Sequence, residues 1–199
     1  MKSARIFLAA AIFALAGCVH RYAPDDALGK GDEPFVPAEF RNGTASLKQV
    51  KAYASSLLGY LGGQSSLEMM EADLNQDGTR DLLVADDSGA GSGGNVYLAF
   101  AKTPTGYRYL GDLSFGALRV LPKDASGKQK MLTMSCAGSG NCTVFLVVLD
   151  ASGFHEVARA YLAAGDSGTN EDNRTADELF GTNQVSAALL AKVFGKGVE

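Results

Sequence analysis

Residues 71–116 read EADLNQDGTRDLLVADDSGAGSGGNVYLAFAKTPTGYRYLGDLSFG, and this stretch decides the fold. An acidic loop at 73–81 leads into a short apolar run at 82–85. A glycine-rich turn then separates it from a second apolar run at 96–101, and the turn at 104–106 precedes a third. Short apolar runs bounded by glycine, proline, aspartate and asparagine are typical of β-strands joined by turns. The stretch therefore predicts consecutive strands.

The same order of turns and strands occurs twice. Residues 90–93 read AGSG, and residues 137–140 repeat these letters 47 positions later, with turns and apolar runs in step on either side. Agreement over so many positions predicts a repeated β unit, at about 73–116 and again at about 120–163. We expect a single, mainly β domain over 44–199 with flanking helices (α+β), as an antiparallel sheet or an incomplete, propeller-like repeat.

The acidic loop has the spacing of a calcium site. Its oxygen-bearing residues fall at loop positions 1, 3, 5, 7 and 9, and Gly78 takes position 6, where a calcium loop turns sharply. Four oxygen side chains in register favour one structural Ca²⁺, and a solvated Asx-rich turn is the alternative. The expected ligands are Asp73, Asn75, Asp77, Asp81 and the carbonyl of Thr79.

The residues after the loop narrow the type of site. An EF-hand needs a bidentate glutamate at position 12, which here is Val84, and it needs a helix where this chain has an apolar strand. The pattern D-x-[DN]-x-D-G-x-x-D leading into a strand resembles the VCBS and FG-GAP repeat families. That resemblance implies a calcium loop in a β-propeller or a related β fold, with one full copy and one degenerate copy in this chain.

The N-terminus resembles a lipoprotein signal. Lys2 and Arg5 precede an apolar run at 6–15, which is too short to span a bilayer and is typical of an export signal. Residues 15–18 read LAGC, which resembles the lipobox of bacterial lipoproteins. The resemblance implies that signal peptide 1–17 is removed and that Cys18 is acylated; an ordinary signal peptide with an incidental cysteine is the alternative.

The next two segments predict a tether and a helix. Residues 18–43 hold three of the five prolines, several acidic residues and no apolar period, as in a flexible linker. From Thr44, apolar residues recur at helical spacing until Gly62, which predicts an amphipathic helix. Its few cations favour packing against a sheet over lying on a membrane.

The second half of the chain adds three predictions. Cys136 and Cys142 lie close together in a chain with an export signal, which predicts a disulfide between them. Residues 143–149 are nearly all apolar and predict a central strand covered on both faces. The polar segment 163–175 predicts a surface loop without a metal pattern, and 184–194 a terminal helix.

Composition and motifs exclude several function classes. With 18 Lys and Arg residues against 22 Asp and Glu, the chain offers no basic patch for a phosphate backbone, so we expect no nucleic-acid partner. The two histidines, His20 and His155, lie far apart, and no nucleophile elbow, zinc-protease motif or phosphate loop occurs. We therefore expect a binding protein and not an enzyme.

A final resemblance suggests the partner. Residues 88–97 read SGAGSGGNVY, which resembles the Ser-Gly-rich loop and strand tyrosine of periplasmic and membrane-bound lysozyme inhibitors and is similar to calcium-binding immunity lipoproteins. In those families the loop enters the cleft of a peptidoglycan hydrolase. The resemblance implies partner-binding residues Ser88, Ser92, Gly93 and Tyr97, although a tight hairpin with a core tyrosine would fit the same letters.

The expected function rests on the lipobox and the loop together. We expect an envelope lipoprotein, anchored to the outer membrane and facing the periplasm, that inhibits or gives immunity to a lysozyme-like hydrolase. The alternative is a structural envelope lipoprotein, or one that binds glycan or peptidoglycan.

Overall fold

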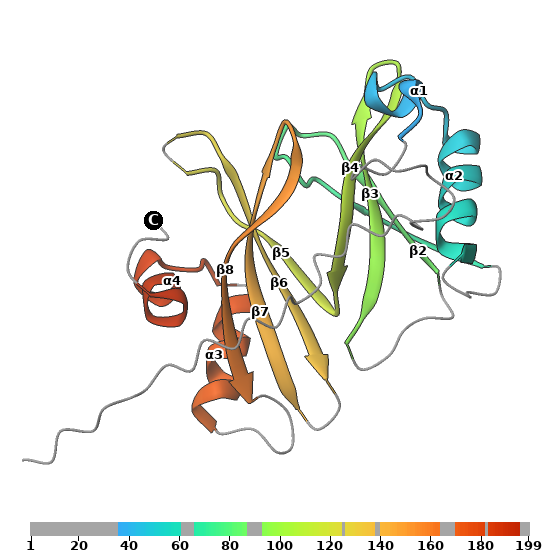
Figure 1. Ribbon diagram of the computed structural model, residues 1–199. Helices are drawn as coiled ribbons and strands as arrows, with labels where there is room; N and C mark the ends of the chain where they lie inside the picture. The colour runs from blue at the N-terminus through green and yellow to red at the C-terminus, as the bar shows by residue number, and fades with distance from the viewer. Residues whose placement is uncertain are drawn as a thin grey trace, which may run out of the picture.

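The computed structural model describes residues 36–60, 66–86, 93–124, 126–137, 140–163, 170–181 and 183–195. The chain forms two antiparallel four-stranded sheets with helices before the first and after the second (Figure 1). The first sheet has the order β1 (Leu67–Ala72), β2 (Asp81–Asp86), β3 (Asn95–Thr103), β4 (Gly106–Phe115). The second has the order β5 (Ala117–Val120), β6 (Gln129–Ala137), β7 (Asn141–Asp150), β8 (Gly153–Ala163). The helices are α1 (Ala38–Arg41), α2 (Leu47–Tyr60), α3 (Asn170–Phe180) and α4 (Ala187–Phe194).

The two sheets are the predicted repeat. Each is a meander whose neighbouring strands follow one another in sequence. The register shifts between Ala99 and Phe100 when β3 pairs with β4, and between Leu146 and Val147 when β7 pairs with β8. These irregularities are 47 positions apart, the same offset as the repeated AGSG letters. The predicted fold class, mainly β with flanking helices in two related units, is confirmed.

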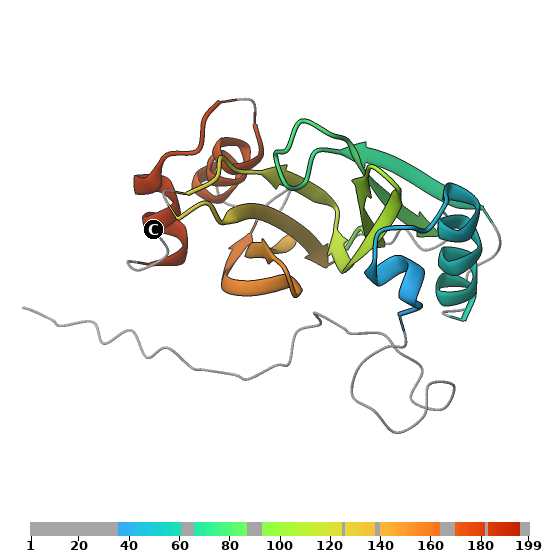
Figure 2. The same cartoon turned by 90° about the horizontal axis from the view of Figure 1, so that it is seen from above.

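Three apolar cores separate four layers. One core lies between the sheets and contains Tyr97 and Ala99 from β3. A second lies between the first sheet and α1 and α2, and a third lies between the second sheet and α3 and α4. Seen from above, the helices again lie at the two ends of the molecule, with the sheets between them (Figure 2). The interior strands β2, β3 and β7 are thus covered on both faces, which explains why their central residues are nearly all apolar without alternation.

The two sheets stack in the same sense, as neighbouring propeller blades do. Leu98 and Phe100 face the helices, but their counterparts 47 positions later, Phe145 and Val147, face the first sheet. The face of the second sheet that packs on the first sheet therefore corresponds to the face of the first sheet that packs on α1 and α2. The N-terminal helices take the place that a preceding blade would occupy.

The folded domain begins earlier than the sequence predicted. The sequence predicts a tether over residues 18–43, but Val36 already packs on the core between the first sheet and helices α1 and α2, and α1 follows it. Phe40 is only 2 % exposed and its ring lies 5.8 Å from that of Phe100. The short helix α1 is held in place by one large aromatic side chain, Phe40. A single apolar residue makes no periodic pattern, so the sequence pattern does not predict this helix.

The long N-terminal helix is confirmed, with a serine cap. The backbone N–H of Gln49 donates to Ser46 Oγ at 3.3 Å, and the N–H of Ser46 donates to Gln49 Oε1 at 2.8 Å. This reciprocal pair is a capping box, which satisfies donors that a helix start leaves free. The buried face of α2 contains Val50, Ala54 and Leu58 and packs on the first sheet, as expected.

The polar segment 163–175 is not wholly a loop, because α3 begins at Asn170. Within α3, Thr175 is buried and its hydroxyl donates to the carbonyl of Glu171, while Leu179 is fully buried in the third core. The terminal helix α4 is capped by Ser186, whose Oγ accepts from the N–H of Leu189 at 3.1 Å.

Among the described residues, no helix combines the length and apolar character that crossing a bilayer would require.

Candidate functional site

The acidic loop connects β1 to β2 and folds around its own carboxylates. Gln76 and Gly78 have φ values of 50° and 85°, which are left-handed backbone conformations typical of tight turns. The two oxygens of Asp73 accept the backbone N–H groups of Asp77 and Gly78 at 3.1 and 3.0 Å. Asp77 in turn accepts the N–H of Thr79 at 2.7 Å. Asp73, Asp77 and the Thr79 backbone are thereby gathered in one turn.

Asn75 completes this group. Its Oδ1 accepts the N–H of Asp77 at 3.0 Å, and its Nδ2 donates to Asp77 Oδ2 at 2.9 Å. The hydrogen bonds from the Thr79 backbone and the Asn75 side chain hold the pKa of the exposed Asp77 carboxyl below its ordinary value. The carboxyl therefore stays ionised across the neutral range.

Asp81 occupies a different environment from the other acidic residues. Its side chain is fully buried at the start of β2, where Oδ2 accepts the N–H of Leu74 at 3.0 Å and Oδ1 accepts the N–H of Lys102 at 2.9 Å. Burial raises the pKa of Asp81 above the ordinary value. This carboxylate ties the loop to the end of β3.

Hydrogen bonds gather four of the five predicted calcium ligands in one turn, whereas Asp81 is held by donors from Leu74 and Lys102. Within the described residues, no three His, Cys, Asp or Glu side chains converge as a metal-holding group. Each carboxylate oxygen has two lone pairs, so an oxygen that accepts an N–H can also bind a cation. Asp73, Asn75, Asp77 and the Thr79 carbonyl remain a compatible oxygen set on the exposed side of the loop.

The matching loop of the second unit is neutralised by a lysine. Asp124 Oδ2 lies 3.4 Å from Lys130 Nζ, and the hydroxyl of Ser126, with other donors, lowers the pKa of Asp124 to about 2. In the first loop, by contrast, no carboxylate of the described residues has a lysine or arginine within ion-pair distance. The first loop concentrates negative charge that is offset mainly by backbone and amide N–H groups, with a small contribution from the nearby Lys123.

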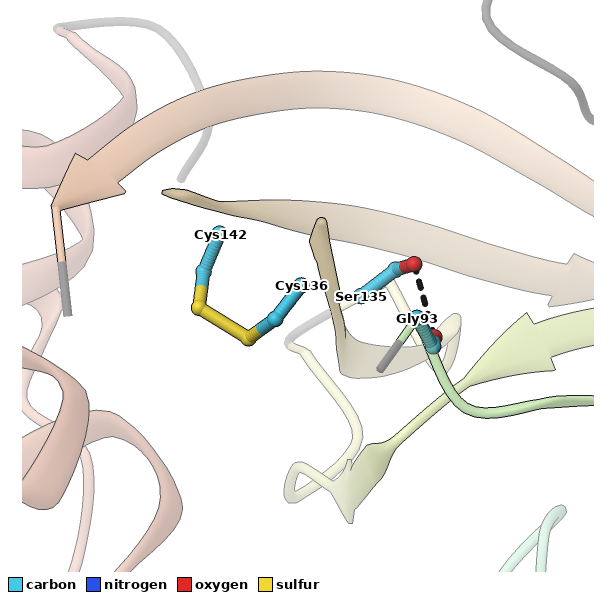
Figure 3. Close-up of a disulfide and its surroundings, with 4 residues drawn as sticks. All are labelled: Gly93, Ser135, Cys136 and Cys142. Carbon is cyan, nitrogen blue, oxygen red and sulfur yellow. Dashed lines mark hydrogen bonds between the residues drawn. A yellow bond between two sulfur atoms is a disulfide. The ribbon is translucent and has the colours of Figure 1, made fainter. Parts of the chain in front are cut away.

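A side-chain hydrogen bond joins the two units at the end of the sheets opposite the acidic loop. Ser135 Oγ, on β6, donates to the carbonyl of Gly93 at 2.8 Å (Figure 3). Cys136 and Cys142 pair across β6 and β7 with an S–S distance of 2.04 Å, so the predicted disulfide is confirmed. We call this end, defined by Gly93, Ser135 and the disulfide, the disulfide edge. The predicted partner-binding residues Ser88 and Ser92 lie outside the described residues.

Tyr97, the fourth expected partner-binding residue, lies in the core between the sheets. It is 7 % exposed, and its ring stacks on Phe115 with centroids 4.3 Å apart. Its hydroxyl donates to Glu68 Oε2 at 3.5 Å, and burial is the main cause that raises its pKa. The ring supports the strand behind the disulfide edge from inside and is not presented to a partner.

A serine, a histidine and an aspartate meet at the turn between β7 and β8, where sequence analysis expected no site. His155 Nε2 lies 2.7 Å from Ser152 Oγ and 3.2 Å from Asp150 Oδ1, and Ser152 Oγ donates to the same Asp150 oxygen at 2.6 Å. A catalytic triad needs the carboxylate on the other ring nitrogen, so that the histidine can take the serine proton. Here Ser152 and Asp150 both contact the same histidine nitrogen, Nε2. The three side chains therefore lack the arrangement of a triad, and their hydrogen bonds belong to the turn between β7 and β8.

The turn has a signal in the sequence, since DASG occurs at 124–127 and at 150–153. In both copies the aspartate Oδ1 accepts the N–H and the hydroxyl of the serine two residues later. Such Asx turns orient a chain reversal. The sequence DASG therefore predicts an Asx turn at each of its two occurrences.

The expected signal peptide 1–17, the expected acylation at Cys18 and most of the predicted tether lie outside the described residues. Comparisons with protein-family models, curated proteins and solved structures found no match to this chain.

Proposed function

We propose that this protein is an outer-membrane lipoprotein, facing the periplasm, that inhibits a lysozyme-like peptidoglycan hydrolase through its disulfide edge. The observation that carries the proposal is the hydrogen bond from Ser135 on β6 to Gly93, the second residue before β3, which joins the two units beside a disulfide. The lipobox resemblance at Cys18 supports the location, and the loop resemblance at 88–97 supports the partner class.

The disulfide edge suits binding because its support is rigid. A cross-link over so short a loop limits the unfolded chain and stabilises the fold by about 2 kcal/mol in the chain-entropy model. Backbone that is held by a disulfide and a hydrogen bond loses little conformational entropy when a partner binds. Tyr97 contributes from the core, by holding β3 in place behind Gly93.

The purified protein should slow the lysis of peptidoglycan by a lysozyme-type muramidase. Ser135→Ala removes the hydrogen bond to Gly93 and should weaken binding about tenfold, equivalent to about 1.4 kcal/mol, with the melting temperature nearly unchanged. Turbidity of a cell-wall suspension reports inhibition, and biolayer interferometry on the immobilised muramidase reports Kd.

Ser126→Ala is the matched control, because it removes a serine hydrogen bond from a loop at the other end of the sheets. It should inhibit as the unchanged protein does. Sedimentation with insoluble peptidoglycan, without any slowing of lysis, would instead support the alternative of a glycan-binding envelope protein. Equal loss from both serine variants would contradict the disulfide edge as the contact.

We further propose that the acidic loop binds one structural Ca²⁺ through Asp73, Asn75, Asp77 and the Thr79 carbonyl, with Asp81 able to join by its remaining lone pairs. The concentration of carboxylates without a lysine or arginine partner supports this, as does the lysine that neutralises the second copy. Calcium prefers such oxygen ligands.

Calcium should raise the melting temperature, because an ion bound only by the folded state stabilises it by RT ln(1 + [L]/Kd). This reaches about 2.7 kcal/mol at a hundredfold excess over Kd. Scanning calorimetry with calcium and with chelator measures the difference. Asp77→Ala should abolish it, whereas Asp124→Ala, in the lysine-neutralised loop, should leave it intact; an unchanged calcium response in the Asp77 variant would refute the site.

A further inference from the structure

A cavity of about 260 Å³ opens at the end of the molecule opposite the disulfide edge. It lies where the acidic loop, β4, the 121–128 loop and the turn after β7 come together. The ten residues of β7 separate it from Cys142 by about 30 Å, from the usual rise per residue in a strand. The cavity is therefore independent of the proposed inhibitor contact.

The cavity wall carries two cations and one carboxylate. The cations are Arg108 from β4 and Lys123, and the carboxylate is Asp150. Asp150 already accepts from Ser152 through Oδ1, and His155 lies beside the same oxygen. Within the described part of the chain, neither cation has a carboxylate within 4.0 Å. The wall thus retains positive charge for an anionic group, and Asp150 keeps a second oxygen for a donor.

The contacts of Lys123 leave its charge largely available. Its Nζ donates to the carbonyl of Gln76 at 3.5 Å, which is a long hydrogen bond. The ammonium lies near enough to Asp77 to help lower the pKa of that carboxyl, but only as the weakest contribution. Arg108 is half-buried, and its guanidinium presents the planar fork of donors that suits a carboxylate.

Gln129, which also lines the cavity, is an unusual polar residue. Its side chain is 3 % exposed, and its Nε2 donates to the carbonyls of Leu121 and Lys130 at 2.6 and 2.9 Å. Its Oε1 is buried and has no hydrogen-bond partner among the described residues. A buried acceptor without a donor is destabilising, so such a group is expected where a ligand or water supplies one.

We propose that this cavity binds a small carboxylate that has an N–H donor beside it, as in an amino acid or the C-terminal residue of a peptide. The carboxylate pairs with Arg108 and Lys123, and the N–H group faces Asp150. Leu110 and Leu149 supply apolar wall for a short side chain. The volume suits one or two residues, since larger ligands occupy cavities of about 300 Å³ or more.

Isothermal titration of the purified chain tests this with four matched probes, all in chelator because Asn75 borders both the cavity and the acidic loop. Alanine carries the carboxylate and an ammonium, N-acetylalanine the carboxylate and an amide N–H, alanine amide no carboxylate, and propionate no N–H. Binding of N-acetylalanine and alanine alike indicates a peptide end, and binding of alanine alone indicates a free amino acid. Propionate should bind at least tenfold more weakly, and alanine amide should not bind.

Binding of alanine amide as strong as that of alanine, or heat from none of the four probes, would overturn the proposal. Arg108→Ala and Lys123→Ala should each weaken the binding probe about tenfold or more. Lys128→Ala removes an exposed lysine of the same loop that does not line the cavity, and it should bind as the unchanged chain does. Equal weakening in all three variants would show that binding depends on the net charge of the protein and not on the cavity. That result would also overturn the proposed site.

Discussion

Replacing Asp81 by alanine should lower the free energy of unfolding by about 4 kcal/mol, measured by urea denaturation in chelator. The buried carboxylate accepts the N–H groups of Leu74 and Lys102. Hydrogen bonds to a charged group each contribute about 1.5–3 kcal/mol, and alanine would leave both donors buried without an acceptor. The substitution would also separate two parts of the fold, because Leu74 belongs to the acidic loop and Lys102 to the end of β3.

Two variants separate this structural effect from calcium binding. Asp81→Asn keeps one acceptor oxygen and should recover about half of the loss. Asp77→Ala removes an exposed carboxylate from the same loop and should leave stability in chelator almost unchanged. If Asp81→Ala unfolds at the same urea concentration as Asp77→Ala, the two buried hydrogen bonds do not stabilise the fold.

Asp81 also makes stability depend on pH. Burial raises the pKa of Asp81 in the folded protein, so the folded state holds the proton more tightly than the unfolded state. The contribution of this group is complete below the unfolded pKa and is lost as pH rises through the folded pKa. Relative to Asp81→Asn, the unchanged chain should gain stability as pH falls from neutral through that range. The same difference at every pH would show that Asp81 does not titrate.

The strands and the repeat were predictable because their signals are local. Apolar runs between turn formers locate β2, β3 and β7, and the AGSG letters recur at the offset of the structural repeat. The disulfide was predictable for the same reason, since two cysteines near one turn face each other across a hairpin. The coverage of both faces of β7 was predictable as well, because residues 143–149 are nearly all apolar.

Long-range contacts decided what the sequence pattern could not. Asp81 has the spacing of a metal ligand, but its orientation depends on an N–H group contributed by Lys102. Tyr97 follows a glycine-rich turn, yet the second sheet buries it. The cavity gathers Arg108, Lys123 and Gln129 from separate segments, and no spacing rule links them.

Replacing Arg119 by alanine should destabilise the protein by about 3 kcal/mol. Arg119, on β5, donates through one guanidinium nitrogen to the carbonyl of Leu179 at 2.9 Å and to that of Gly181 at 2.6 Å. The other nitrogen donates to the carbonyl of Asn183. These carbonyls belong to the end of α3 and the chain beyond it, where a helix carries partial negative charge and a cation is stabilising.

The arginine therefore fastens the C-terminal helices to the second sheet. Leu179 is fully buried beneath α3 against Leu132 and Leu146, so loosening the helix end would open the third core to water. Charge-assisted hydrogen bonds at about 1.5–3 kcal/mol each, reduced because this site is half exposed, give the stated loss. Arg119→Lys keeps the charge without the fork and should recover only part of it.

Arg174→Ala is the matched control, because the Arg174 side chain is 67 % exposed and its one ion-pair partner among the described residues is Glu178, one turn along the same helix. Such surface pairs contribute at most about 0.5 kcal/mol. Thermal denaturation followed by circular dichroism should thus separate the two arginine variants by several degrees. Coincident melting curves would show that the contacts of Arg119 with the three carbonyls do not hold α3 on the sheet, and the third core alone would then account for its position.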